Sequence, residues 1–338
     1  MEASAERQQR ARSIAVAAAG AFVCAGIALI AWRVIVGPTR VVGVQPGARL
    51  LAVSRGTISW FGRTCSVWQA QLDGRRAVEP LEPVLPLGAC PLDDPRFDGD
   101  VFYHLAGMGW ITRNHLGQRR VMVERQLAFA LALDGHDLYV GNCAQRENCQ
   151  IERMPAEDDP GDPLLIQAGI LHLANMAVDA REIFWVDRGR RKRDCSDQYY
   201  DDSDPPVLRC KEPMPPRLMA AAKGEPRASE RVVLSEFDGN RPLLGARHVY
   251  WLGAGGVHRI PKEGGANQLV LPTRGLTGFA ADGNDVFFAA DAGIFHARDG
   301  DEVRPLQSMG KPPSGLAADS GYVYWIDPAA NAVVRRRE

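Results

Sequence analysis

The segment Leu276–Gly300, LTGFAADGNDVFFAADAGIFHARDG, is followed by a near copy of itself in Pro313–Glu338, PSGLAADSGYVYWIDPAANAVVRRRE. Each copy holds a small apolar run, a turn around Asp-Gly or Asp-Ser, an aromatic run, and a further apolar run that leads into arginine. Short runs of Val, Ile, Phe, Tyr and Trp bounded by Gly, Asp and Pro are typical of β-strands. The two copies therefore predict a small β-sheet unit that repeats along the chain.

The same pattern recurs five more times upstream. Clear copies start at Leu127, Leu171 and Arg241, and weaker ones start at Leu50 and Asp94. The last residues of the seven aromatic runs are Trp60, Tyr103, Val140, Trp185, Trp251, Phe288 and Trp325. These residues are separated by 43, 37, 45, 66, 37 and 37 positions. A period of roughly 40 residues in a chain of short strands is typical of the blades of a β-propeller.

Stacking around an axis gives a physical reason for the repeat. One small twisted sheet leaves both faces exposed, whereas stacked sheets cover one another's faces, and closure of the ring protects their edges. Seven units at near-equal spacing argue against a β-sandwich or a barrel. We therefore predict an all-β fold over residues 37–338, a β-propeller of seven blades with four strands each. Six or eight blades are the alternatives, because the first two units are weak.

Two of the aromatic runs end in a shared motif. Val323–Asp327 reads VYWID and Ile183–Asp187 reads IFWVD, and both resemble the YWTD repeat of β-propellers of the low-density lipoprotein receptor type. The resemblance covers about residues 45–338 and implies the architecture alone, with the motif in a structural role. Other units have Gly62, Asn142, Gly253 and Ala290 at the position of the final Asp. We infer no receptor function from the resemblance.

The segment Thr39–Val44, TRVVGV, is a short β-type run ahead of the first unit. The sequence ends at Glu338, directly after the third strand of the last unit. We expect Thr39–Val44 to supply the fourth strand of the last blade and so to close the ring by hydrogen bonds. By the family resemblance, the small apolar run is the innermost strand of each blade and the aromatic run is the second.

The N-terminal segment differs in composition from the rest of the chain. Ile14–Trp32 carries no charged side chain, and about 20 apolar residues suffice for a helix to cross a hydrocarbon core of roughly 30 Å. Three cations precede this run, namely Arg7, Arg10 and Arg12. The positive-inside rule then places the N-terminus in the cytoplasm.

These features predict a single-pass membrane protein. We expect a cytoplasmic tail over residues 1–12, a transmembrane signal-anchor helix over residues 13–36, and an extracytoplasmic propeller in the periplasm or the extracellular space. A cleaved signal peptide is the alternative, although its small residues would follow the apolar run, and here they lie inside it.

Six cysteines lie beyond the apolar run, namely Cys65, Cys90, Cys143, Cys149, Cys195 and Cys210. An even number in an exported domain suggests disulfide bonds. The spacings favour the local pairs Cys143–Cys149, Cys195–Cys210 and Cys65–Cys90, although six cysteines allow 15 connectivities. None has the C-x2-C spacing of a zinc site, so we predict no metal there.

The 66-residue interval contains an insertion over residues 188–217. It begins with a basic run and continues into an acidic run with two tyrosines between them. Because loops on rigid scaffolds often carry binding sites, we treat it as a candidate contact surface. The candidate residues are Arg190, Arg191, Lys192, Arg193, Tyr199, Tyr200, Asp201 and Asp202. The alternative is a solvated, self-neutralising loop.

Composition and motifs restrict the function. The 338-residue chain has a formal net charge of −1, which gives no indication of a nucleic-acid partner. It has no P-loop, GxSxG or HExxH motif, and we predict no cofactor and no catalytic residues. We expect a non-enzymatic module that binds a protein or an envelope component. The alternative is a propeller-type hydrolase or lactonase with a metal site on the central axis.

Overall fold

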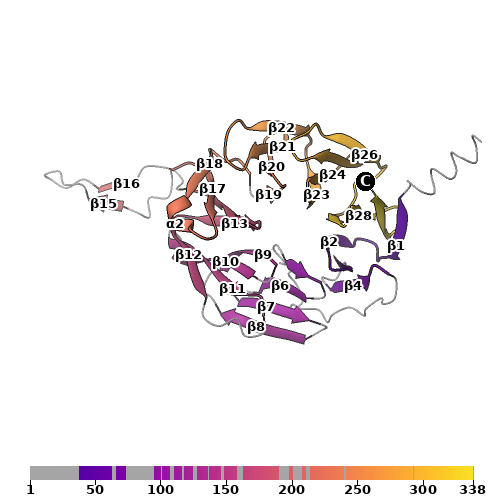
Figure 1. The fold of residues 1–338 in the computed structure, drawn as a ribbon, viewed down its shortest axis with the longest axis horizontal. Helices are drawn as coiled ribbons and strands as arrows, with labels where there is room; N and C mark the ends of the chain where they lie inside the picture. Colours follow the sequence, from indigo (N-terminus) through magenta and orange to yellow (C-terminus); the bar gives the residue numbers. More distant parts are fainter. Residues whose placement is uncertain are drawn as a thin grey trace, which may run out of the picture.

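The computed structural model describes residues 38–337 apart from 63–65, 74–94, 100, 107–109, 116–117, 125–127, 136, 146–147, 158–162, 190–197, 201–207, 211–213, 240 and 292. Small antiparallel sheets stand side by side around a central axis and form a ring (Figure 1). The prediction of a seven-bladed β-propeller is confirmed. The proposed helix over residues 13–36 lies outside the described residues.

Blades 1 to 3 form the first part of the ring. The described residues of blade 1 form β2 (Arg49–Ser54), β3 (Thr57–Phe61) and β4 (Val67–Gln71). Blade 2 consists of β5 (Arg96–Asp98), β6 (Val101–Ala106), β7 (Trp110–His115) and β8 (Gln118–Glu124). Blade 3 consists of β9 (Ala128–Asp134), β10 (Asp137–Gln145), β11 (Asn148–Pro155) and β12 (Leu164–Ile170).

Blade 4 contains the insertion. Its sheet has β13 (Leu173–Val178), β14 (Glu182–Asp187), β17 (Arg217–Ala222) and β18 (Arg231–Ser235), and the one-turn helix α2 (Pro226–Ser229) precedes β18. Within the insertion, β15 (Gln198–Tyr200) pairs with β16 (Leu208–Cys210). The insertion thus includes a separate two-stranded hairpin, which lies away from the ring in Figure 1.

Blades 5 to 7 complete the ring. Blade 5 consists of β19 (Leu243–Leu244), β20 (His248–Gly253), β21 (Gly256–Pro261) and β22 (Gln268–Pro272). Blade 6 consists of β23 (Leu276–Asp282), β24 (Asp285–Ala290), β25 (Gly293–Arg298) and β26 (Arg304–Ser308). Blade 7 consists of β27 (Leu316–Asp319), β28 (Tyr322–Asp327), β29 (Ala332–Arg337) and the N-terminal β1 (Thr39–Gly43).

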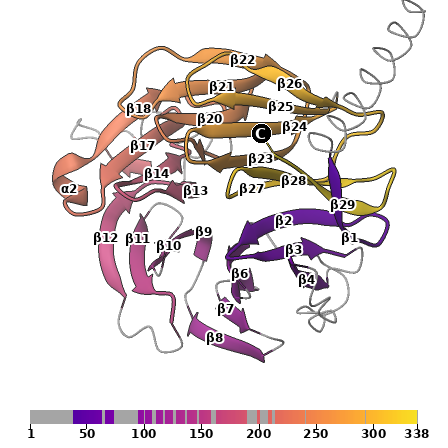
Figure 2. The same cartoon turned by 45° about the vertical axis from the view of Figure 1, so that its right-hand side comes forward.

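The closing strand is the one that the sequence predicts. β1 pairs antiparallel with β29, with Thr39 opposite Arg335 and Arg40 opposite Val334. Figure 2 shows this N-terminal strand beside the C-terminal one. Val41 and Val42 pack against the cluster between blades 7 and 1 that includes Val333. Closure therefore combines hydrogen bonds with apolar burial.

The aromatic second strands form the core between blades. Trp185, Trp251 and Trp325 are each at most 1% exposed. A typical inter-blade cluster joins Phe184 of β14 to Val249 of β20. Each blade therefore covers the apolar face of the next, as the repeat predicts.

The YWTD-like aspartates have local structural roles. Asp327 accepts a hydrogen bond from the main-chain N–H of Ala329 at 2.8 Å, and Asp187 accepts one from Gly189 at 3.0 Å. Asp187 also binds Arg217 at 2.8 Å. Each carboxylate fixes the start of the connection that follows its strand, which is the structural role that the resemblance implies.

One predicted disulfide is confirmed. Cys143 and Cys149 face each other across β10 and β11 and are bonded, with an S–S distance of 2.02 Å. Cys65, Cys90 and Cys195 lie outside the described residues, and of Cys210 the structure describes only its place in β16. The pairs Cys195–Cys210 and Cys65–Cys90 stay predictions.

Candidate functional site

A repeated acidic position lies where the innermost strand of a blade turns into the second. We call these connections the inner turns. In five blades the same register position in or next to this turn holds an aspartate, and the five are Asp98, Asp134, Asp179, Asp282 and Asp319. Because every inner turn lies at the same end of the strands, these carboxylates form a series at one end of the ring.

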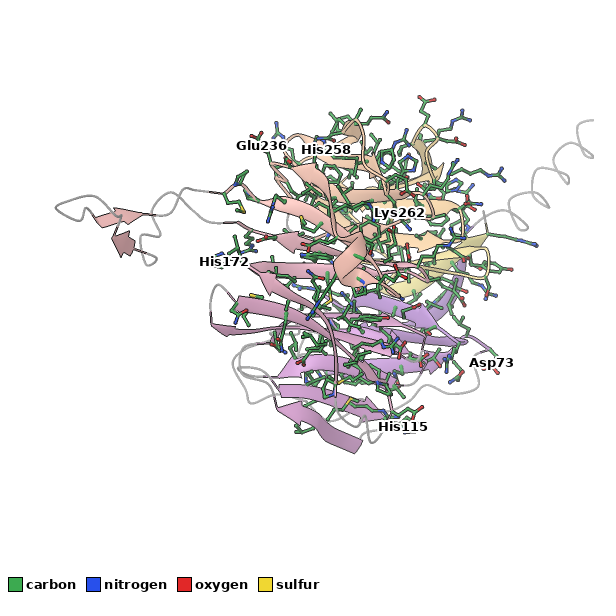
Figure 3. The ribbon with its side chains drawn as sticks, turned by 60° about the vertical axis from the view of Figure 1, so that its left-hand side comes forward. Asp73, His115, His172, Glu236, His258 and Lys262 are labelled. Carbon is green, nitrogen blue, oxygen red and sulfur yellow. A yellow bond between two sulfur atoms is a disulfide. The ribbon has the colours of Figure 1, made fainter. Side chains whose placement is uncertain are left out.

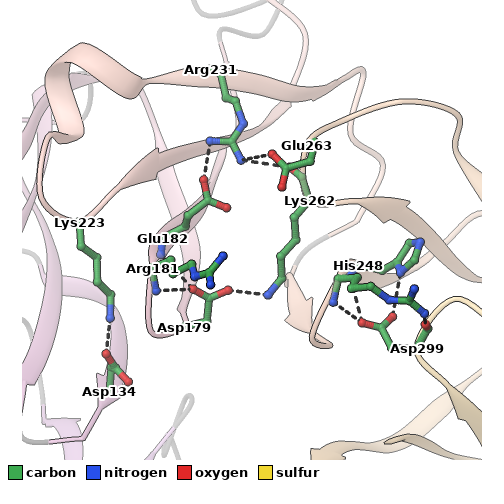
Figure 4. Close-up of polar contacts among 11 residues, drawn as sticks. Asp134, Asp179, Arg181, Glu182, Lys223, Arg231, His248, Lys262, Glu263 and Asp299 are labelled. Atoms are coloured by element: carbon green, nitrogen blue, oxygen red, sulfur yellow. Dashed lines mark hydrogen bonds and ion pairs between the residues drawn. The ribbon is translucent and has the colours of Figure 1, made fainter. Parts of the chain in front are cut away.

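Two lysines bind this series from neighbouring blades. Lys223 and Lys262 occupy the same position after the third strands of blades 4 and 5. Lys223 forms an ion pair with Asp134 of blade 3, and Lys262 forms one with Asp179 of blade 4 (Figure 4). The Lys262 ammonium also lies 5.8 Å from the centre of the Phe184 ring. The Lys223 ammonium likewise lies 5.0 Å from the centre of the Tyr139 ring, so both lysines join adjacent blades by an ion pair and a cation–π contact.

Between blades 5 and 6 the carboxylate comes from the other of these two positions. Gly245 occupies the aspartate position in the inner turn of blade 5, and Asp299 occupies the lysine position of blade 6. A Cβ atom on Gly245 would lie 2.8 Å from Asp299 Oδ2. The missing side chain therefore leaves the space that the carboxylate of the next blade fills.

Asp299 is fully buried and accepts hydrogen bonds from three residues. The Tyr250 hydroxyl donates at 2.6 Å, His248 donates through Nδ1 at 2.8 Å, and the main-chain N–H of Arg247 donates as well. Burial by itself would raise the pKa of Asp299, but these hydrogen bonds outweigh it and hold the pKa below its ordinary value. Burial and the bond to Asp299 raise the pKa of Tyr250.

A cavity opens beneath these turns. It has a volume of about 780 Å³ and is lined by residues 178–182 of blade 4, 244–248 and 261–263 of blade 5, and Ala281 and Gly283 of blade 6. We call it the blade 4–6 cavity. Its size is that of a pocket for a small ligand or a peptide segment.

Ion pairs hold most of the charged groups of this cavity. Glu182 binds Arg231 at 2.6 Å. Asp179 accepts hydrogen bonds from Lys262 and from the main-chain N–H groups of Arg181 and Glu182. Burial by itself would raise the pKa of Asp179, but these bonds lower it by more, so the pKa lies below its ordinary value. Figure 3 shows Lys262 among the side chains of the ring, and Figure 4 shows the polar contacts at close range.

The insertion lies at the other end of β14 from this cavity. Glu182 at the start of β14 lines the cavity, whereas the insertion follows Asp187 at the end of the strand. Tyr199 and Tyr200 belong to β15, where they pair with Arg209 and Leu208. The remaining predicted site residues lie outside the described residues, namely Arg190, Arg191, Lys192, Arg193, Asp201 and Asp202.

Sequence analysis missed the blade 4–6 cavity, although a signal for it is present. Aligning the ends of the strands would have placed Lys223 beside Lys262, and Asp134 beside Asp179. The sequence alone predicted no role for those positions, because the pairing between blades is not local in sequence.

Two further findings concern possible metal ligands and the helices of the described residues. Within the part of the chain that the structure describes, no group of three or more His, Cys, Asp or Glu side chains is placed to hold a metal ion. Among those same residues, none of the helices has the length and apolar character that crossing a membrane requires.

Comparison with protein-family models gives no match, and comparison with curated proteins gives none either. Solved structures do match. The computationally designed protein Ika8 is 9% identical with a TM-score of 0.53, over 88% of this chain and 99% of that one. The structure "YCF48 bound to D1 peptide" is 13% identical with a TM-score of 0.52, over 88% and 96%.

A third match is the extracellular domain of the putative hybrid two-component system BT4673 from B. thetaiotaomicron. It is 11% identical with a TM-score of 0.54, and the match covers 88% of this chain but 40% of that one. At such identities these likenesses show the propeller fold alone.

Proposed function

We propose that this protein is a membrane-anchored, extracytoplasmic β-propeller that binds a protein or an envelope component and catalyses no reaction itself. The blade 4–6 cavity is the observation that carries this proposal. Glu182, Lys262 and His248 are held in place before a ligand arrives, Glu182 by an ion pair within blade 4 and the other two by contacts with neighbouring blades. Groups that are already ordered bind a partner with less loss of side-chain entropy.

The protonation states of Asp179 and Asp299 favour binding over acid–base catalysis. A general acid or base works best with a pKa near the working pH. The pKa values of Asp179 and Asp299 are instead held below their ordinary values. Both carboxylates therefore stay anionic at neutral pH and act as fixed charges that position Lys262 and His248.

The anchor is part of the proposal and rests on the sequence. Residues 13–36 are apolar almost throughout, and β1 begins at Thr39. The disulfide between Cys143 and Cys149 supports an extracytoplasmic site, since such bonds persist in oxidising compartments. We also propose that the blades are of the YWTD type, a view supported by the roles of Asp187 and Asp327.

The insertion over residues 188–217 is proposed as a further contact surface. Its hairpin of β15 and β16 lies away from the ring (Figure 1), and projecting loops on a rigid scaffold often carry binding sites. Deleting the insertion leaves the residues of the blade 4–6 cavity unchanged, so the two surfaces can be tested separately.

A bulky side chain in the cavity tests the proposed function. Ala246 is exposed and lines the blade 4–6 cavity, and Ala246→Trp would fill part of it without removing a charge. Ala330 is also an exposed turn alanine, at the opposite end of the ring strands, and Ala330→Trp is the matched control. The tagged full-length variants are purified in neutral detergent from their native membranes, and copurifying molecules are quantified.

We expect Ala330→Trp to retain the molecules that copurify with the wild type and Ala246→Trp to lose at least one of them. Equal recovery with both variants would show that the cavity is not the binding site. Thermal unfolding of each variant checks that the ring is intact.

A further inference from the structure

Two arginines of the blade 4–6 cavity have no carboxylate partner among the described residues. Arg181 and Arg247 both line the cavity, and both are exposed. Within the described part of the chain, the Arg181 guanidinium makes no hydrogen bond and no ion pair. The Arg247 guanidinium donates to the main-chain oxygen of Asp299, which is a neutral acceptor. The positive charges of both guanidinium groups therefore stay uncompensated by contact.

The carboxylates of Asp299 and Asp179 already accept hydrogen bonds from other donors. Asp299 already accepts bonds from Tyr250, from His248 and from the Arg247 main chain. Asp179 is bound by Lys262 and by two main-chain N–H groups. The carboxylates thus have little capacity left for either guanidinium.

The opposite charge is in excess at another part of the wall. Arg231 lies 2.6 Å from Glu182 and 3.9 Å from Glu263, so one cation serves two carboxylates there. The Glu263 side chain is 87% exposed. The cavity is therefore polarised, with unpaired cations at Arg181 and Arg247 and an excess of one negative charge where Glu182 and Glu263 share Arg231.

We propose that the blade 4–6 cavity binds a carboxylate group of a peptide or protein partner through the guanidinium groups of Arg181 and Arg247, which both line it. This inference rests on the proposed binding function and adds the chemistry of the ligand. The planar guanidinium group matches a carboxylate in two parallel hydrogen bonds. A phosphate dianion would meet more repulsion from Glu182 and Glu263 than a carboxylate monoanion does.

Labelled peptides are the probes for this proposal. The first is a short Gly/Ser peptide with several Glu residues and an amidated C-terminus, and the second is a Gly/Ser peptide with a free C-terminal carboxylate. The third is the amidated Gly/Ser peptide without Glu, which carries no carboxylate. Binding to the full-length protein in neutral detergent is measured by fluorescence anisotropy, with acetate and inorganic phosphate as competitors at equal ionic strength.

We expect at least one carboxylate-bearing peptide to bind more tightly than the uncharged one. Arg181→Gln should weaken that binding by about fivefold, since one charge-assisted contact is lost. Glu263→Gln should strengthen it, because a repelling charge is removed. Arg298→Gln is the control, because Arg298 is exposed on blade 6 outside the cavity and its loss lowers the net charge equally.

Arg247→Lys complements Arg247→Gln, because it keeps the charge but loses the planar guanidinium. If Arg247→Gln unfolds the protein, Arg181→Gln decides the question, since the Arg181 side chain makes no hydrogen bond and no ion pair within the described structure. Equal affinities for Arg181→Gln and Arg298→Gln, or stronger competition by phosphate than by acetate, would overturn the carboxylate site.

If no peptide binds while Ala246→Trp still loses a copurifying partner, the carboxylate inference is wrong and the binding function stands. If both experiments fail, the proposed function fails as well.

Discussion

Two glycines show how single residues exchange roles between blades. Gly245 lacks the inner-turn aspartate, and Asp299 from the next blade fills its place. Gly253 lacks the YWTD-like aspartate, and Asp238 approaches the place where its Cβ would be, at 2.6 Å. Asp238 accepts bonds from Trp251 Nε1 at 2.8 Å and from the N–H of Ala254 at 2.7 Å. In both cases a carboxylate lies where the aspartate of the other blades lies, although it comes from a different position in the sequence.

Asp299→Asn tests whether this replacement matters for stability. Removing a buried carboxylate that accepts several hydrogen bonds should lower the free energy of unfolding at pH 7 by about 3 kcal/mol. Because the pKa of Asp299 is depressed in the folded state, its stabilisation is complete above the unfolded pKa of about 3.9 and is lost as the pH falls through the lower folded pKa. Urea unfolding is measured between pH 7 and pH 3. The difference in the free energy of unfolding between wild type and Asp299→Asn should become smaller below a pH of about 4.

Asp301→Asn is the control for this series. Asp301 is exposed and lies two positions from Asp299, so its substitution should change the free energy of unfolding by less than about 0.5 kcal/mol. If the difference in the free energy of unfolding between wild type and Asp299→Asn stays constant across the pH range, the assigned role of the carboxylate is wrong.

At the scale of strands, the aromatic runs were predictable because their pattern is local. The runs that contain Trp185, Trp251 and Trp325 are second strands of their blades, as the family resemblance implied. The closing strand was predictable for a different reason, since the last unit lacked a fourth strand and Thr39–Val44 had strand composition. The ion pairs between turns were not predictable in this way, because each joins residues more than 80 positions apart.

Engineered cysteines test the register of the closing strand. Arg40 faces Val334 across β1 and β29, and facing residues in an antiparallel pair approach closely enough for a disulfide. We expect the Arg40→Cys, Val334→Cys double variant to form this cross-link under mild oxidation, as detected by mass spectrometry of the digested protein. Arg40→Cys with Arg336→Cys is the control pair, and preferential cross-linking of that pair would show a different register.

At the scale of the whole molecule, the fold was predicted more fully than the site. The ring follows from the repeat, whereas the blade 4–6 cavity depends on turns from three blades that meet only after the ring closes. The insertion over residues 188–217 could be predicted as a candidate surface, because it lengthens the interval between two aromatic runs to 66 residues. Cavities formed by turns of ordinary length, such as 244–248, leave no comparable mark in the sequence.

We propose that an anchor at residues 13–36 holds the closed ring on the outer side of a membrane. The direct test is protease treatment of cells whose outer layers are opened while the inner membrane stays sealed. The full-length protein carries one tag at the N-terminus and another at the C-terminus. We predict that the C-terminal tag and the insertion are digested while the N-terminal tag stays protected until detergent is added. Protection of both tags before lysis would contradict this account.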